Sequence, residues 1–177
     1  MTIHNAENLN VLWFLPTYGD SRYLGSDVGS RPVDISYLAQ VARAADDIGS
    51  YGVLIPTGVT CEDSWVVASA LAPQTRQLRF LVAARPGLMS PTLSARMTAT
   101  LDRVSNGRLL INIVTGGSPK ENAGDGFLAD HAERYAITDE FLSIYRDVLR
   151  GEPVTRKSAR CDLTGAHLQF PSVQAGG

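Results

Sequence analysis

The sequence has few of the residues that build disulfide frameworks or metal centres. Its 177 residues include two cysteines, Cys61 and Cys161, and three histidines, His4, His131 and His167, all far apart along the chain. Two cysteines at this distance are too few for a disulfide framework and carry no CxxC spacing. None of the histidines forms a ligand-spaced pair with a cysteine. We therefore expect neither a disulfide scaffold nor a metal site.

Long apolar runs and strong charge are also missing. No apolar stretch approaches the roughly 20 residues that cross a bilayer. The start, MTIHNAENLN, lacks the basic and apolar regions of a secretion signal. The formal net charge is −2, and the 16 lysines and arginines are scattered rather than gathered into a basic patch. These features predict a cytoplasmic chain that binds neither a membrane nor nucleic acid.

The motifs of several large enzyme classes are missing as well. No GxGxxG follows the first apolar run, which removes most support for a Rossmann dinucleotide site. GxxxxGK[ST], HExxH and GxSxG are also absent, so the sequence offers no P-loop, no zinc-protease helix and no hydrolase nucleophile elbow. What remains for chemistry is a set of polar residues spread over several loops.

The sequence does contain a regular alternation of strand-like and helix-like segments. The strand-like segments are apolar runs, each continuous enough for a strand that is buried on both faces: 11–15, 52–55, 78–84 and 109–114. The helical patterns between and after them cover 34–49, 63–73, 90–106 and about 131–150. The order βαβαβαβα predicts a single α/β domain with a parallel sheet.

Three finer expectations concern packing and the tail. Trp13 and Phe14 are expected to pack within the sheet. The tail 152–177 is expected to add one hairpin that turns at Thr164-Gly165. The helix that begins after Ser90 is expected to bury the four apolar residues that share one of its faces, Leu93, Met97, Leu101 and Val104.

Polar residues follow each predicted strand directly. Because the carboxyl ends of parallel strands meet at one edge of a sheet, their loops converge on the usual place of a ligand site. The segment 115–130 is also longer and richer in glycine than a routine connection, which favours a functional loop. The polar residues of this predicted rim are Thr17, Tyr18, Asp20, Thr57, Thr60, Cys61, Arg85, Thr115 and Ser118.

Some of these residues allow a structural interpretation beside a functional one. Cys61 precedes a helix whose dipole favours a thiolate, but a small buried thiol is an equal alternative. Arg85 can hold an anionic group, or it can form a salt bridge with Glu62 or Asp63. On position alone, Tyr135 is closer to a core aromatic than to a site residue.

Four segments of the chain together resemble alkanesulfonate monooxygenases, of the bacterial-luciferase-like group of flavin-dependent monooxygenases: WFLPTYGDSRYLG, GVLIPTGVTCEDSW, RPGLMSPTLSARMTATLDRVSNGRLLINIVTG and DHAERYAITDEF. The resemblance runs from about Leu9 to Gln174. It implies a (β/α)₈ TIM barrel, of which this chain holds about the first four βα units. It also implies reduced FMN supplied by a separate NAD(P)H-dependent FMN reductase. The implied reaction converts an alkanesulfonate and dioxygen to an aldehyde and sulfite. The resemblance also implies that the protein is a homo-oligomer.

The resemblance assigns roles residue by residue. Cys61 falls on a cysteine near the flavin, and Tyr18 falls in the catalytic first loop. Arg85 falls on a rim arginine, which we expect to bind substrate. The positions that line the flavin site correspond here to Thr57, Asn112, Val114, Thr115 and Tyr135.

Two departures from the family pattern shape the prediction. Tyr18 stands where the family has a histidine, so a hydrogen-bonding role is retained but proton shuttling near neutral pH is not. Four βα units leave a strand edge unpaired and the apolar inner face of the barrel open. The alternatives are a non-catalytic half-barrel that self-associates, or another flavin- or deazaflavin-dependent oxidoreductase. We expect little or no turnover from this chain alone.

Overall fold

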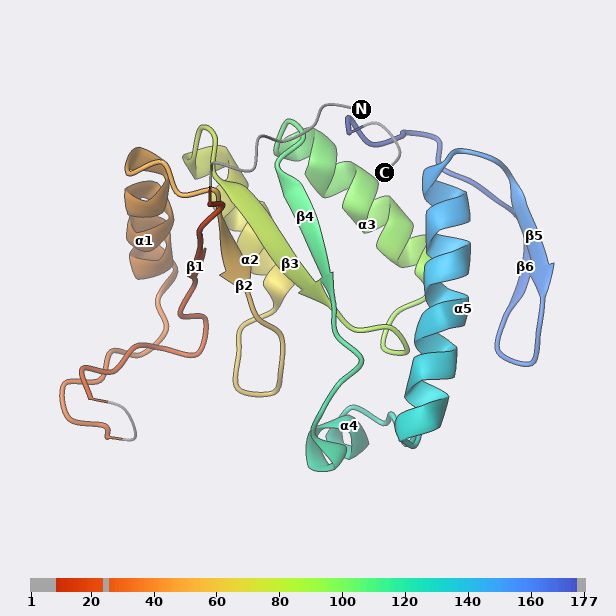
Figure 1. The fold of residues 1–177 in the computed structure, drawn as a ribbon, viewed down its shortest axis with the longest axis horizontal. Coiled ribbons are helices and arrows are strands. Elements are labelled where there is room, and N and C mark those ends of the chain that lie inside the picture. Colours follow the sequence, from red (N-terminus) through yellow and green to blue (C-terminus); the bar gives the residue numbers. More distant parts are fainter. Residues whose placement is uncertain (1–8, 24–25, 175–177) are drawn as a thin grey trace.

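The computed structural model describes residues 9–23 and 26–174. Its main sheet has four parallel strands in the order β1-β2-β3-β4, as the sequence predicts (Figure 1). The strands are β1 (Leu12–Phe14), β2 (Gly52–Ile55), β3 (Arg79–Ala84) and β4 (Leu109–Ile113). Consecutive strands are neighbours, so each βα unit adds one strand to the same edge, as in a (β/α) barrel. The predicted α/β class with a parallel sheet is confirmed.

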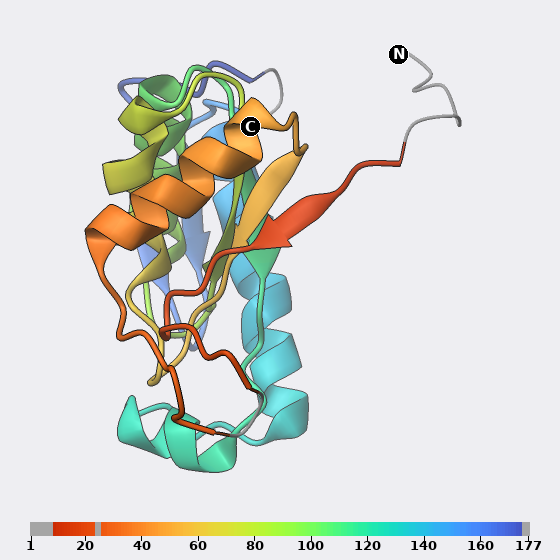
Figure 2. The ribbon, with the colours of Figure 1, turned by 90° about the vertical axis from the view of Figure 1, so that its left-hand side faces the viewer.

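Helices alternate with these strands, and side-chain caps set where they begin. α1 (Ile35–Asp47), α2 (Ser64–Leu71) and α3 (Pro91–Val104) lie on one side of the sheet (Figure 2). Asp34, Asp63 and Ser90 cap them by accepting hydrogen bonds from backbone N–H groups of the first turn. Pro73 does not end α2 abruptly but lies in a 3₁₀ turn, Ala72–Gln74, that continues it. No helix of the described ranges is long and apolar enough to cross a membrane.

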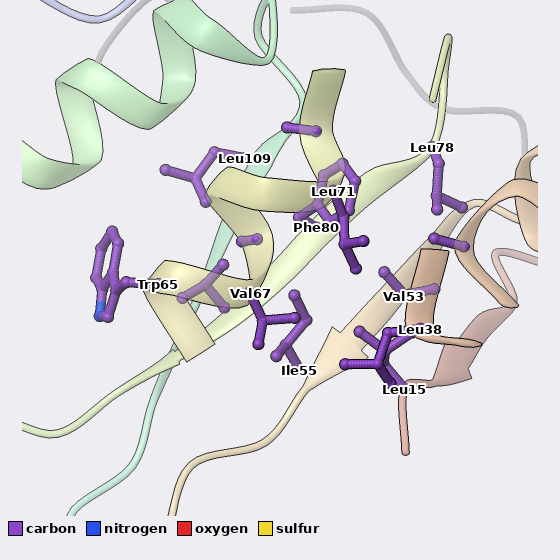
Figure 3. Packing of buried hydrophobic residues seen from close by; sticks show 14 of the residues in the cluster. Leu15, Leu38, Val53, Ile55, Trp65, Val67, Leu71, Leu78, Phe80 and Leu109 are labelled. Atoms are coloured by element: carbon purple, nitrogen blue, oxygen red, sulfur yellow. The ribbon is translucent and has the colours of Figure 1, made fainter. Parts of the chain in front are cut away.

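The main core fills the space between the sheet and α1–α3 (Figure 3). Strand residues alternate between the two faces of the sheet, and the members facing these helices are fully or almost fully buried. Leu71 of α2 and Leu38 of α1 pack against them. The strand residues in this core are Val53, Ile55, Phe80, Val82, Ala84 and Leu109.

The opposite face of the sheet carries a row of apolar side chains. The register aligns Phe14 with Leu54, Leu54 with Leu81, and Leu81 with Leu110, one residue from each strand. Phe14 is 46% exposed, and the three leucines are half-buried. The apolar inner face expected of an open half-barrel is therefore present on the side away from α1–α3.

Two packing expectations were wrong. Trp13 and Phe14 do not pack inside the sheet, because β1 is an edge strand and leaves them 55% and 46% exposed. The predicted buried face of α3 is also wrong at its ends, since Leu93 and Val104 are exposed. The residues buried instead are the small or polar ones at Ser94, Ala95, Thr98, Ala99 and Asp102.

Helix α5 (His131–Leu149) explains the altered face of α3. It packs beside α3, where Thr98 and Tyr145 share a 2.8 Å hydrogen bond between their hydroxyl groups. Small residues on α3 let the two helices approach closely. A second hydrophobic cluster forms around this contact, separate from the main core, from Ala95, Phe141, Ile144, Tyr145, Val148, Leu149 and Val154.

The tail forms a hairpin, but not at the predicted turn. β5 (Val154–Lys157) and β6 (Asp162–Ala166) are antiparallel, so Thr164-Gly165 lies inside a strand. The turn occupies 158–161, where the Ser158 hydroxyl accepts hydrogen bonds from the backbone N–H groups of Arg160 and Cys161. This local serine turn, rather than the Thr-Gly pair, sets the hairpin. The start of the chain, expected to carry no secretion signal, lies outside the described residues at positions 1–8.

Candidate active site

The loops after the four strands converge at the carboxyl end of the sheet. The backbone N–H of Glu62 donates to the carbonyl of Thr17 at 2.9 Å, which joins the loop after β2 to the loop after β1. Thr17 is buried, and its Oγ1 has no hydrogen-bond partner among the described residues. The structure thus brings the first two polar loops together as the sequence predicts.

Tyr18 lies at the mouth of a mostly apolar groove beside β1. Its side chain is 60% exposed, and its ring stands edge-on to Phe14 with 6.1 Å between the ring centres. The groove has a volume of about 510 Å³ and is also lined by Trp13, Tyr37 and Val41. The phenol of Tyr18 is therefore accessible to a small molecule at the rim.

Asp20 anchors the same loop to helix α1. Tyr37 donates its hydroxyl to Asp20 Oδ2 at 2.6 Å, and the guanidinium of Arg31 lies 4.1 Å from the centre of the Tyr37 ring. The hydrogen bond to Asp20 and then burial raise the pKa of Tyr37 above its usual value. The Asp20 carboxylate is already paired, so its position in the loop is structural.

Thr57 and Cys61 lie in the loop after β2. Both are half-buried, and the N–H of Cys61 donates to the Gly58 carbonyl at 3.0 Å in a tight turn. Cys61 precedes Asp63, the N-cap of α2, by two residues. The Cys61 thiol is free and half-buried rather than buried. Its catalytic role and the flavin contact of Thr57 stay predictions.

Arg85, directly after β3, is held by two side chains of one short helix and by the side chain of the residue that follows it. This helix, α4 (Pro119–Gly124), lies within the long segment after β4 (Figure 1). Arg85 Nη1 donates to Glu121 Oε1 at 3.0 Å and to Asp125 Oδ2 at 2.8 Å, and Nη2 donates to Asn122 Oδ1 at 2.6 Å. Arg85 is 8% exposed. Its guanidinium thus pairs with two carboxylates, and its predicted contact with substrate stays a prediction.

The structural alternative for Arg85 named the wrong partners. Glu62 and Asp63 were expected to form its salt bridge, but Asp63 caps α2 by accepting from Val66 N. The acidic partners are instead Glu121 of α4 and Asp125, the residue that follows α4, about forty positions away in sequence. Pairs at this separation cannot be chosen from one sequence, because each depends on the path of an irregular loop.

Gly116 allows α4 to fold back on Arg85. Its backbone has a φ of +81°, a region that side chains disfavour, and a β-carbon there would lie 2.6 Å from Asn122 Oδ1. The same β-carbon would lie 3.3 Å from Arg85 Nη2. Only a residue without a side chain leaves room for the hydrogen bond between Arg85 and Asn122.

Asn112 and Val114 continue the open face of the sheet toward the rim, and Thr115 follows them in the loop after β4. Asn112 aligns with Ala83 of β3, on the face opposite the main core, and is half-buried. Val114 extends the ladder by donating its N–H to the Ala84 carbonyl at 2.9 Å. The amide side chain of Asn112 thus lies beside the apolar row near the end of β4, and Thr115 begins the following loop.

Tyr135 lies apart from these loops, near the start of α5. It is 54% exposed, so the interpretation as a core aromatic is wrong. Its ring lies 5.0 Å from that of His131, between ring centres, and His131 is the first residue of the helix. The described contacts do not join Tyr135 to Thr57, Cys61 or Arg85. Its role in flavin binding stays a prediction.

The residues that sequence reasoning missed are Glu121, Asn122 and Asp125 of the α4 region. A signal was available, because Ser118-Pro119 followed by Glu121 is typical of a helix start. Ser118 does cap α4 by accepting from the N–H of Glu121 at 3.3 Å. Among the described residues, no group of three or more histidine, cysteine or acidic side chains could hold a metal ion.

Four parallel βα units with polar loops at the strand ends correspond to about half of a TIM barrel with its ligand-binding rim. A family profile for luciferase-like monooxygenases matches residues 9–176. The chain belongs to the luciferase-like monooxygenase family, whose members are flavin-dependent oxidoreductases that use FMN or the deazaflavin F420.

Solved structures share the fold at low sequence identity. The monooxygenase RslO1 from Streptomyces bottropensis has a TM-score of 0.76 at 20% identity and matches 93% of this chain but 50% of its own. EDTA monooxygenase from Chelativorans sp. BNC1 has a TM-score of 0.75 at 18% identity, and the match covers 90% of this chain and 47% of that protein. A third match is the oxygenating constituent of 3,6-diketocamphane monooxygenase from the CAM plasmid of Pseudomonas putida, in complex with FMN. Its TM-score is 0.73 at 17% identity, and the match covers 94% of this chain and 49% of that protein. The chain spans about half the length of these proteins.

Proposed function

We propose that this chain forms the first four βα units of a reduced-FMN-dependent alkanesulfonate monooxygenase. The observation that carries the proposal is the row Phe14, Leu54, Leu81 and Leu110 on the open sheet face, which leads at the rim to Asn112 and to the threonines of two loops. Membership of a flavin-dependent family supplies the cofactor class.

The chemistry of this surface fits the ring system of a flavin. An isoalloxazine is a broad apolar plate with hydrogen-bond donors and acceptors along one edge. Four apolar side chains offer a surface for the plate, and the Asn112 amide offers one donor group and one acceptor for its edge. Thr57 and Thr115 add hydroxyl groups, which both donate and accept.

In this proposal the protein binds, orients and excludes water. When bound, reduced flavin supplies the electrons that activate dioxygen for insertion into the substrate. The apolar row keeps water from one side of the ring, and Asn112 fixes the orientation of its polar edge. Tyr18, exposed at the mouth, donates a hydrogen bond to an anionic oxygen of the substrate. In this role the phenol of Tyr18 orients the substrate.

The sulfonate substrate and the reductase partner rest on the sequence segments rather than on the fold. The segments around Tyr18, Cys61 and Asn112 resemble alkanesulfonate monooxygenases in particular. We infer that a separate NAD(P)H-dependent reductase delivers the reduced FMN. A deazaflavin-dependent activity is the second candidate, since coenzyme F420 dependent tetrahydromethanopterin reductase from Methanopyrus kandleri shares the fold with a TM-score of 0.70 at 20% identity.

An anaerobic titration with reduced FMN tests the cofactor proposal. We expect weak but saturable binding, further weakened by Asn112→Ala and unchanged by Asn10→Ala, an exposed asparagine elsewhere on the chain. Failure to bind any flavin, or equal binding by the two variants, overturns it. Preferential binding of coenzyme F420 over FMN favours the second candidate.

Sulfite release from an alkanesulfonate, with a FMN reductase present, tests the substrate proposal. We expect little or no sulfite from this chain alone, and sulfite from a longer version that supplies the remaining barrel strands. Oxidation of another substrate class by that longer version, without sulfite release, overturns the sulfonate assignment.

We also propose that the chain self-associates. Within the described sheet, β1 and β4 are each paired on one side only, and all four strands are parallel. A twofold axis along the barrel direction pairs β1 of each copy with β4 of the other, which gives eight parallel strands with two identical junctions. Exposed Trp13 and Phe14 at the β1 edge would be buried there. Analytical ultracentrifugation should show a dimer, and a monodisperse monomer contradicts the proposal.

A further inference from the structure

Glu121 contacts two loops other than its own. Its Oε1 accepts a hydrogen bond from the backbone N–H of Val59 at 3.0 Å and another from Arg85 Nη1 at 3.0 Å. Val59 belongs to the loop after β2, Arg85 follows β3, and Glu121 lies on α4 after β4. One carboxylate oxygen therefore connects the loops of three consecutive strands.

The environment of this carboxylate shields its ion pair with Arg85, whereas the Val59 backbone that it also binds lies at the surface. Glu121 is 23% exposed and Arg85 is 8% exposed, so water competes weakly for their ion pair. A hydrogen bond to a charged acceptor is about twice as strong as one between neutral groups. The carboxylate also lies against Gly58, where a β-carbon would be 3.0 Å from Oε1.

We propose that Glu121 is a positioning residue that fixes the 57–61 loop, and with it the Thr57 hydroxyl and the Cys61 thiol, at the rim. Val59 lies midway between these two residues, so holding its N–H restrains both. The consequence for flavin binding rests on the function proposed above, whereas the restraint on the loop does not.

Asp125 provides a matched control within the same cluster. Its carboxylate accepts from Arg85 Nη1 at 2.8 Å, the same nitrogen that donates to Glu121. Its contact, however, ends at Arg85, while Glu121 continues to the Val59 backbone. If charge neutralisation of Arg85 were the whole role of Glu121, the two carboxylates would be interchangeable.

The thiol of Cys61 reports loop order directly. In a Cys161→Ala background, Cys61 is the one remaining thiol, and its modification by a small neutral reagent measures the opening of the loop. We expect Glu121→Ala to accelerate labelling about tenfold, the factor that follows from losing one charge-assisted hydrogen bond. Glu121→Gln keeps an acceptor oxygen for Val59 N and should restore most of the protection. Asp125→Ala should stay close to the parent rate.

Global destabilisation is separated from local opening by the second cysteine. In a Cys61→Ala background, labelling of Cys161 in the hairpin turn should not change with Glu121→Ala. Equal acceleration at Cys161 and Cys61, or equal effects of Glu121→Ala and Asp125→Ala at Cys61, overturns the proposal. If Glu121→Ala does not fold, amide hydrogen exchange of the unmodified chain decides instead, because a Val59 N–H as fast as a free amide overturns it.

Measuring flavin binding by the same variants distinguishes the loop restraint by Glu121 from the proposed function. We expect Glu121→Ala to weaken reduced-FMN binding and Asp125→Ala to leave it within about twofold. A chain that binds no flavin at all, yet shows the labelling pattern above, retains Glu121 as the loop restraint and refutes the proposed function.

Discussion

The hydroxyl of Tyr37 on α1 lies 2.6 Å from Asp20 Oδ2, and through this hydrogen bond the first helix holds the loop that carries Tyr18. The loop is further fixed by backbone hydrogen bonds between Asp20 and Arg31, at 2.9 and 2.7 Å. The rim is thus built from contacts between loops and helices as much as from the strands beneath it.

Replacement of Tyr37 by phenylalanine tests the contact with Asp20. The hydrogen bond and burial raise the pKa of Tyr37 above 10.0, so the neutral phenol is favoured in the folded state. Its stabilisation is fully present below about pH 10 and is lost as the pH rises through the raised pKa. We expect Y37F to lower the free energy of unfolding by about 1 kcal/mol near neutral pH. As the pH rises above 10, the free energy of unfolding of Y37F should also fall less than that of the parent protein.

Urea unfolding near neutral pH and above pH 10 measures both effects. Tyr23→Phe is the control, because Tyr23 is an exposed tyrosine in the same region. A similar change in Y23F, or an unchanged alkaline profile in Y37F, contradicts the expectation.

The Asp46 carboxylate contributes to the fall in the free energy of unfolding at acid pH. Burial alone would raise the pKa of this carboxyl, but backbone N–H donors from Arg76, Gln77 and Leu78, at 2.7 to 2.9 Å, outweigh it and lower the pKa. A lowered pKa gives stability that is present above about pH 4 and is lost as the pH falls through the folded value. We expect Asp46→Asn to lower stability by about 2 kcal/mol near neutral pH and to flatten the acid decline.

The neighbouring Asp47 gives the comparison for Asp46. Its carboxylate pairs with Arg76 at the surface, 65% exposed, and such pairs contribute about 0–1 kcal/mol. Denaturant midpoints across acid pH measure both variants. The prediction fails if Asp47→Asn costs as much as Asp46→Asn.

Arg108 stabilises the amino end of the sheet. Its guanidinium donates to the carbonyls of Ala72, Leu78 and Ser105 and to the hydroxyl of Thr75, at 2.6 to 2.8 Å. Lysine cannot reproduce this set of donors. We expect Arg108→Lys to lower the free energy of unfolding by about 2–4 kcal/mol, since several buried acceptors lose their partners. Arg96→Lys, at an exposed site on α3, should have little effect in the same thermal melts.

Two adjacent glycines give an internally controlled test of the α4 contact. Gly116 has a φ of +81° and no room for a β-carbon beside Asn122, whereas a β-carbon at Gly117 meets nothing within 4 Å. We expect Gly116→Ala to lower the free energy of unfolding by about 1–3 kcal/mol and Gly117→Ala to change it little. Chemical denaturation of the two variants side by side measures the difference, and equal stabilities would show that Arg85 and Asn122 adapt without cost.

The order of the elements could be predicted from the sequence because each element has a local signal. Continuous apolar runs indicate buried parallel strands, and Ser90-Pro91 marks a helix start that the structure confirms. The convergence of Thr17 and the loop after β2 follows from the parallel order alone.

Features that depend on a distant partner could not be predicted in this way. The buried face of α3 is set by α5, so Ala95 and Thr98 are buried while Leu93 is exposed. Arg85 is held by α4, whose position depends on the conformation of Gly116. The α3 helix was predicted correctly, whereas the segment 115–130 was predicted as a loop and contains α4. In both cases the surface that the element packs against is not encoded nearby in the sequence.

The two hydrophobic clusters divide the molecule into two units, which we expect to unfold with different free energies. Helix α3 places Leu101 in the cluster under the sheet and Ala95 in the cluster formed with α5 and the hairpin. α5 supplies the large side chains of the second cluster, Phe141, Ile144, Tyr145, Val148 and Leu149, so its packing is separate from that of the sheet. It meets α3 at small side chains and at the hydroxyl pair of Thr98 and Tyr145. It is therefore poised to undock together with the hairpin while the parallel sheet stays folded, a subglobal opening with a lower free energy than complete unfolding. Amide protons of α5 would then exchange as one group, ahead of those of β2 and β3.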